Sequence, residues 1–207
     1  MPSPCDHEDR PVATADVTRY AAFLRGINLG NRRIRNHELR GHFEAIAGLR
    51  DIATFLASGN VAFGLATPSG ARPSIAILEE TIQTHLAAAL GYDVDTFVRG
   101  FADLERVVDG ETAGRLLPCN GGDAWKLHVI FLKDEPEAAA AEALRELATD
   151  DDRFDVEGRE GYWLRRGGLS DSKLMPADLE RALGVSTSTM RTHNTVARLL
   201  AKFGESA

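Results

Sequence analysis

The chain has 207 residues, of which 43% are hydrophobic, and this suits two small globular domains or one fused double domain. The formal net charge of −7 argues against a protein that coats nucleic acid non-specifically. The two cysteines, Cys5 and Cys119, form no disulfide framework and suit a reducing compartment, and no apolar stretch is long enough to cross a bilayer. We therefore expect a cytoplasmic protein with no membrane partner.

The first residues, 1–18, are polar and rich in proline, and they lack the apolar run of a signal peptide. We expect a disordered tail. Residues 19–100 then show the order strand, helix, strand, strand, helix, strand. A continuous apolar run at 20–24 predicts a buried strand, and two further apolar runs flank Ser58-Gly59-Asn60, which indicates a β-hairpin.

Residues 101–124 contain one short helical pattern followed by a glycine-rich stretch, and we interpret them as a linker. Residues 125–207 repeat the order of the first unit and add a C-terminal helix with apolar residues on one face. The strand, helix, strand, strand, helix, strand order is that of the ferredoxin-like fold. The sequence therefore predicts an α+β protein of two tandem ferredoxin-like (βαββαβ) subdomains with antiparallel sheets, plus a C-terminal helix.

Polar residues follow the first two strands of the first subdomain. These strands should run in the same direction, so the loop with Arg25 and Asn28 should lie beside the turn Ser58-Gly59-Asn60. Arginines and glycine-rich backbone favour an anion. The alternatives are a purely structural turn, a solvated basic loop at 32–35, and an internal carboxylate as the partner of Arg25.

A second polar group is expected at one edge of the second sheet. Lys173 follows the third strand of this subdomain, and Arg191 and Asn194 follow the end of the fourth. Because these two strands run in the same direction, Lys173 should lie near Arg191. The group again favours an anion. The alternative is that Asn194 or Thr192 caps the last helix while Arg191 forms a salt bridge.

Histidines provide no metal site in this sequence. His37 and His42 are five residues apart and point to different faces of a helix. His128 lies in an apolar strand, which predicts a hydrogen-bonded core histidine. No motif identifies a cofactor.

Three motifs carry a resemblance to a known family. They are Phe-Leu-Arg-Gly-Ile-Asn at 23–28, Ser-Gly-Asn at 58–60, and the segment Thr-Met-Arg-Thr-His-Asn-Thr-Val at 189–196. Together they resemble the bacterial family of domain of unknown function 1697 over nearly the whole chain after the tail. The resemblance implies two ferredoxin-like subdomains and no established activity. Thr192 and His193 replace the family's frequent asparagine and tryptophan, so no ligand role is carried over to them.

The leading hypothesis is a protein that binds a small phosphorylated or carboxylated ligand. The candidate contacts are Arg25, Asn28, Ser58, Gly59, Asn60, Lys173, Arg191 and Asn194. An enzyme acting on such a ligand is the first alternative, although no general base accompanies these donors. Binding of RNA or single-stranded nucleic acid ranks lower, because aromatic residues make up only 7% of the chain. The remaining alternative is a structural or self-association protein whose polar groups only join the subdomains; the sequence indicates no oligomeric state.

Overall fold

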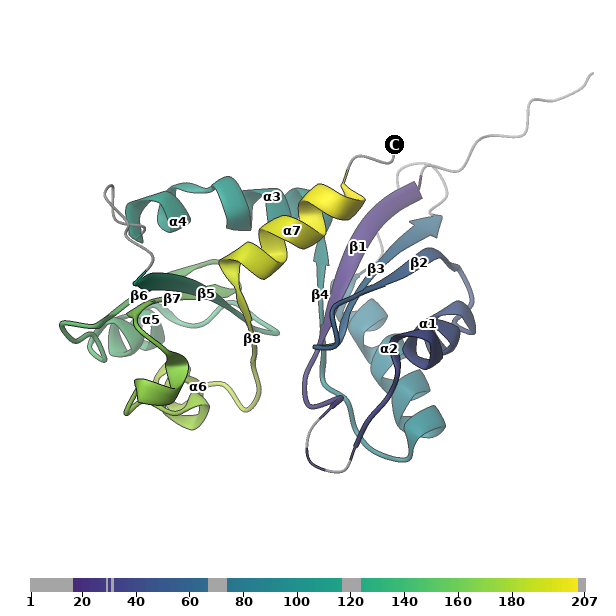
Figure 1. Ribbon diagram of the computed structural model, residues 1–207, viewed down its shortest axis with the longest axis horizontal. Coiled ribbons are helices and arrows are strands. Elements are labelled where there is room, and N and C mark those ends of the chain that lie inside the picture. Colours follow the sequence, from purple (N-terminus) through teal and green to yellow (C-terminus); the bar gives the residue numbers. More distant parts are fainter. Residues whose placement is uncertain (1–16, 29, 31, 67–73, 117–123, 205–207) are drawn as a thin grey trace, which may run out of the picture.

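The computed structural model describes residues 17–28, 30, 32–66, 74–116 and 124–204. They form two four-stranded antiparallel sheets, each covered on one face by two helices (Figure 1). The predicted α+β fold with two similar subdomains and a C-terminal helix is confirmed. Residues 1–16, which make up most of the expected tail, and both cysteines lie outside the described residues.

The first subdomain has the strand order β2-β3-β1-β4. Both β1 and β2 pair antiparallel with β3, so they run in the same direction, as predicted. Strand β1 begins at Val17, within the segment expected to be tail. The elements of the first subdomain are β1 (Val17–Leu24), α1 (Asn36–Glu44), β2 (Leu49–Phe55), β3 (Asn60–Ala66), α2 (Ile75–Leu90) and β4 (Thr96–Gly100).

The second subdomain has the corresponding order β6-β7-β5-β8. Strands β7 and β8 both pair antiparallel with β5, so they also run in the same direction. Its elements are β5 (Trp125–Phe131), α5 (Ala138–Arg145), β6 (Asp152–Glu157), β7 (Glu160–Arg166), the short 3₁₀ helix η1 (Leu169–Asp171), α6 (Pro176–Leu183), β8 (Thr189–Thr192) and α7 (His193–Phe203).

The connection between the subdomains carries more structure than the sequence indicates. It forms two helices, α3 (Phe101–Asp109) and α4 (Glu111–Leu116). The glycine-rich composition suggests an irregular linker after α3, but Ala113 and Leu116 of α4 are buried in the core that the two sheets share. Tertiary packing thus stabilises a short helix whose local sequence does not favour one.

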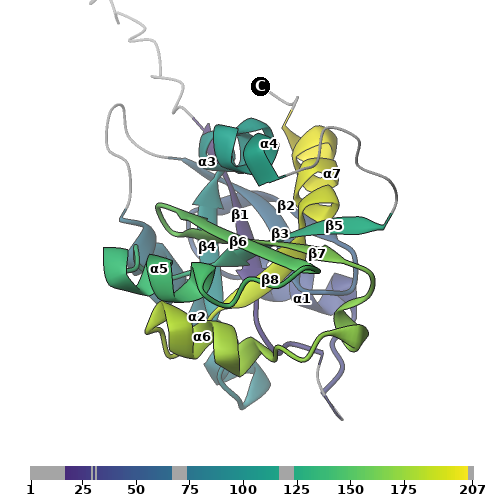
Figure 2. The same ribbon diagram turned by 90° about the vertical axis from the view of Figure 1, so that its left-hand side faces the viewer.

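The two sheets face each other across this shared core. Helices α1 and α2 cover the outer face of the first sheet, α5 and α6 cover that of the second, and α3 and α7 lie alongside each other at one end (Figures 1 and 2). At the centre, the rings of Phe23 on β1 and Phe131 on β5 are stacked, with centroids 4.2 Å apart and an interplanar angle of 8°. The packing of one sheet on the other therefore joins the subdomains through apolar burial.

None of the helices in the described part of the chain has both the length and the apolar character required to cross a membrane.

His128 on β5 lies beneath the outer helices of the second sheet, next to the indole of Trp163. It is 4% exposed. The predicted core position is confirmed, but the imidazole makes no hydrogen bond with the described residues. Burial, with a smaller contribution from the charge of Lys126, lowers the pKa of His128 from 6.5 to about 4.

We expect this histidine to make the folded state sensitive to acid. Between about pH 6.5 and pH 4 the unfolded chain binds a proton that the folded chain excludes, so stability falls as the pH is lowered through this window. The loss should approach about 3 kcal/mol. Denaturant titrations from pH 7 to pH 4 should show that His128→Leu removes this component, whereas His37→Leu, at an exposed position, retains it. An unchanged pH profile in His128→Leu would show that His128 does not carry the effect.

Candidate functional site

The loop after β1 and the turn after β2 lie side by side at one edge of the first sheet, as predicted. The backbone N–H of Leu24 donates to the carbonyl of Gly59 at 2.8 Å. Asn28 joins the same segments: its Nδ2 donates to the carbonyl of Ala57 at 2.7 Å, and its Oδ1 accepts from the N–H of Ile34 at 2.9 Å. The Asn28 side chain therefore holds the loop in place against the turn.

Gly59 is required by the close approach of these segments. Its φ is +72°, and a Cβ built there would lie 2.7 Å from Cγ2 of Ile27. Asn60 is fully buried and donates from Nδ2 to the carbonyl of Phe55 and to Oγ of Ser58, each at 2.9 Å. Gly59 and Asn60 are buried and fix the backbone of the turn, whereas Ser58 is exposed at its surface.

Arg191 of β8 reaches across from the second subdomain to this turn. Its Nε donates to Oδ1 of Asn60 at 2.6 Å, and its Nη2 donates to the carbonyls of Leu24 and Ser58, both at 2.8 Å. Its Nη1 donates to Oγ1 of Thr189 at 2.9 Å and to the carbonyl of Met190 at 2.8 Å. Arg191 is therefore the member of the second predicted polar group that contacts the turn of the first.

All the acceptors around the Arg191 guanidinium are neutral. Among the described residues no carboxylate lies within ion-pair distance of it, so the alternative of a salt bridge is not observed there, and side-chain and backbone oxygens accept its hydrogen bonds instead. Burial lowers the pKa of Arg191 to about 10, which still leaves the group protonated at neutral pH. The site therefore holds a full positive charge that no described residue balances with a carboxylate beside it.

An open depression of about 530 Å³ lies over this arrangement. Its lining includes Ser58 and Thr189, which carry hydroxyl groups, and the apolar residues Leu24, Ile27 and Leu56. No aspartate, glutamate, histidine or cysteine is among its described lining residues. These are Leu24, Gly26, Ile27, Asn28, Leu56, Ala57, Ser58, Thr189 and Arg191.

Arg25 points away from the depression toward α6. Its Nη1 pairs with Oε1 of Glu180 at 2.5 Å and also donates to Oγ1 of Thr187 at 2.9 Å. Glu180 accepts in addition from the N–H and the hydroxyl of Ser188. Of the two partners considered for Arg25, the internal carboxylate is the one observed, and the pair links the two subdomains.

Lys173 and Asn194 are not among the described residues that line the depression. Lys173 is exposed between η1 and α6 and makes no hydrogen bond with Arg191, so its nearness to Arg191 stays a prediction. Asn194 is exposed in the first turn of α7, and the cap of this helix is Thr192, whose Oγ1 accepts from the N–H of Thr195 at 3.2 Å. The alternative role of Thr192 as the cap is thus confirmed.

Sequence reasoning did not identify Thr189 and Leu56 as part of the site. Leu56 has a φ of +58°, a rare conformation for a residue with a side chain, and it lies in the turn that carries Ser58. Thr189 becomes part of the lining of the depression because β8 of the second subdomain packs against the first subdomain. No local pattern signals the left-handed conformation of Leu56, and the position of Thr189 depends on how the two sheets pack.

Comparison with known proteins agrees with this architecture. Residues 17–162 match the family described as "Protein of unknown function (DUF1697)". Among solved structures, the chain is similar to "The structure of conserved bacterial protein SP0830 from Streptococcus pneumoniae", with 22% sequence identity, a TM-score of 0.65, and coverage of 92% of this chain and 100% of that chain. At this identity the likeness concerns the fold. No curated protein shows significant similarity to the chain. Because the family match spans most of the sequence, the chain belongs to the DUF1697 family of unknown function.

Proposed function

We propose that the protein binds a small phosphorylated or carboxylated ligand in the depression beside Arg191. The observation that carries this proposal is the Arg191 guanidinium, which is enclosed by neutral acceptors and has no carboxylate partner among the described residues. An uncompensated charge in a partly dehydrated position attracts an opposite charge to the nearest accessible space. That space is the depression.

The ligand would be held by hydroxyl groups and by the field of the guanidinium. The N–H groups of Arg191 already donate to protein oxygens, so the guanidinium would attract an anion through its positive charge and not through a direct hydrogen bond. At about 5 Å and an effective dielectric constant of about 20, that attraction is about 3 kcal/mol. Ser58 and Thr189 accept from Asn60 and Arg191, and each hydroxyl keeps its own proton to donate to an anionic oxygen.

Binding is favoured over catalysis because the described lining of the depression supplies no carboxylate, histidine or cysteine, so the hydroxyl groups of Ser58 and Thr189 have no general base to activate them. The absence of an aromatic side chain from the same lining gives nucleic-acid bases nothing to stack on. A purely structural role would use the same Arg191 contacts, so removal of Arg191 cannot separate the two functions. Its loss would leave several acceptors unpaired and destabilise the junction in either case.

We expect a thermal-shift screen of phosphate, nucleotides, sugar phosphates and small carboxylates to identify a compound that raises the melting temperature. A ligand present at 100 times its dissociation constant adds about 2.7 kcal/mol to the free energy of unfolding. Ser58→Ala and Thr189→Val should abolish most of this gain, because they remove the donors. The melting temperature of each unliganded variant should stay within a few degrees of that of the unmodified protein, since each loses about one hydrogen bond.

Ser170→Ala is the matched control, since Ser170 is exposed in η1 and lies outside the depression. It should respond to the ligand like the unmodified protein. The proposal is wrong if no compound in the screen raises the melting temperature, or if the gain persists in both Ser58→Ala and Thr189→Val.

A further inference from the structure

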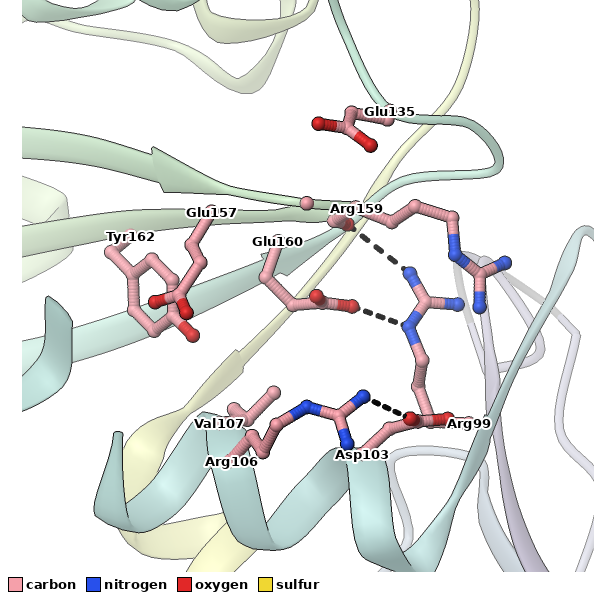
Figure 3. A pocket seen from close by; sticks show the side chains of 10 residues that line it. Arg99, Asp103, Arg106, Val107, Glu135, Glu157, Arg159, Glu160 and Tyr162 are labelled. Carbon is pink, nitrogen blue, oxygen red and sulfur yellow. Dashed lines mark hydrogen bonds and ion pairs between the residues drawn. The ribbon is translucent and has the colours of Figure 1, made fainter. Parts of the chain in front are cut away.

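A second cavity, of about 460 Å³, lies between the subdomains (Figure 3). Most of its lining comes from β4, α3 and the β6–β7 hairpin. The hairpin contributes Glu157, Glu160 and Tyr162, and α3 contributes Asp103 and Arg106. Arg99 of β4 lies at the base of the cavity with a side chain that is 1% exposed. The cavity shares no lining residue with the depression beside Arg191.

The hydroxyl of Tyr162 is an unpartnered polar group in this cavity. Tyr162 is 2% exposed, and its hydroxyl makes no hydrogen bond with the described residues. A tyrosine whose ring is buried ordinarily gives its hydroxyl a hydrogen-bond partner. In Figure 3 the hydroxyl end of Tyr162 points toward the side chains that line the cavity. The hydroxyl is therefore placed to bind an occupant of the cavity.

Two glutamates face each other at the end of the hairpin. Glu157 and Glu160 are cross-strand partners, an arrangement in which like charges repel. Glu160 is neutralised by its ion pair with Nε of Arg99, whereas Glu157 forms no ion pair with the described residues. Burial raises the pKa of Tyr162, and the charges of Glu160, Glu157 and Asp155 raise it further. The carboxylates thus make the space around the hydroxyl electrically negative.

The other charged side chains of the cavity do not balance this negative charge. Arg106 pairs with Asp103 at 2.5 Å. Arg159 donates to the carbonyl of Lys133 at 3.3 Å, and neither it nor Glu135 has an ion-pair partner among the described residues. Two unpaired carboxylates therefore stand against one unpaired guanidinium. Among the described residues, no group of three or more histidine, cysteine, aspartate or glutamate side chains could hold a metal ion. The occupant considered for this cavity is an organic cation, whose charge would complement the excess of carboxylates.

We propose that this cavity binds a primary ammonium group. An ammonium has three donors and no acceptor, which suits the oxygen of Tyr162 and the carboxylates of Glu157 and Glu160. Arg159, which also lines the cavity and has no ion-pair partner among the described residues, would receive a carboxylate on the same ligand. The ammonium can therefore belong to a simple amine or to an amino acid. Only the amino acid has a carboxylate for Arg159 to bind.

The proposal is tested by titrating the full chain, carrying ¹³C-labelled tyrosine, with 1,4-diaminobutane, L-ornithine and butanoate. The chain has three tyrosines, and Tyr162→Phe assigns the ring signals of Tyr162 by their disappearance. We expect a saturable shift of these signals with at least one of the two ammonium compounds and none with butanoate. Tighter binding of L-ornithine that is reduced by Arg159→Gln identifies an amino acid, and equal or tighter binding of 1,4-diaminobutane identifies an amine.

Titration calorimetry compares the affinities of the variants. Tyr162→Phe and Glu157→Gln should each weaken binding about tenfold, equivalent to about 1.4 kcal/mol. Neither should lower the melting temperature, because neither group has a protein partner to lose. Glu105→Gln, an exposed position of α3 outside the cavity, should bind like the unmodified protein. The proposal is overturned if neither ammonium compound shifts the Tyr162 signals, or if both cavity variants keep full affinity.

Discussion

Replacement of Arg99 by methionine should lower the free energy of unfolding by about 3 to 5 kcal/mol. The guanidinium pairs with Glu160 and donates to the carbonyls of Val98 and Leu132, so it joins β4 to the second subdomain (Figure 3). Burial lowers the pKa of Arg99, and the neighbouring charge of Glu160 opposes this effect. Methionine fills the space of the arginine stem but leaves Glu160 without its partner.

Urea titrations measure this loss, and two further variants test its cause. Arg106→Met removes an exposed arginine that pairs with Asp103 and should cost less than about 1 kcal/mol. Combining Arg99→Met with Glu160→Gln should cost less than the sum of the two single changes, because the second change removes the uncompensated charge. A loss below about 1 kcal/mol in Arg99→Met would show that this ion pair does not hold the subdomains together.

Phe23→Ala is expected to destabilise the protein by a similar amount, about 3 to 5 kcal/mol. Phe23 is fully buried and stacks on Phe131 of the opposite sheet. Its removal leaves a cavity at the centre of the shared core, where packed side chains on both sides cannot collapse completely. Because this core belongs to both subdomains, they should still unfold in a single transition at a lower denaturant concentration.

The matched control for this substitution is Phe203→Ala near the end of α7, where the ring is only partly buried. It should cost clearly less than Phe23→Ala when both are measured by urea titration at the same pH. Two separate transitions in Phe23→Ala, with only the first subdomain destabilised, would contradict the role assigned to the shared core.

Strand order and the nearness of the first loop to the Ser58 turn could be predicted from the sequence. Apolar runs, turn residues and helical periodicity are local signals, and the ferredoxin-like order then fixes strand direction. The predicted strand directions placed Asn28, Ser58, Gly59 and Asn60 at one edge of the first sheet, as the structure confirms. The second helix of the connection, α4, gave no such signal, since its stability comes from packing in the shared core.

The partners of the charged residues were decided only by the docking of the two sheets. Arg191 and Asn60 are 131 positions apart, and Arg25 and Glu180 are 155 apart. From the sequence, the partner of Arg25 could be a ligand or a carboxylate, and that of Arg191 could be an anionic ligand or a carboxylate in a salt bridge. Strand patterns determine each sheet by itself, because alternation and turns act over a few residues. The packing of Phe23 on Phe131 determines how the sheets meet, and so it determines which polar groups share a site.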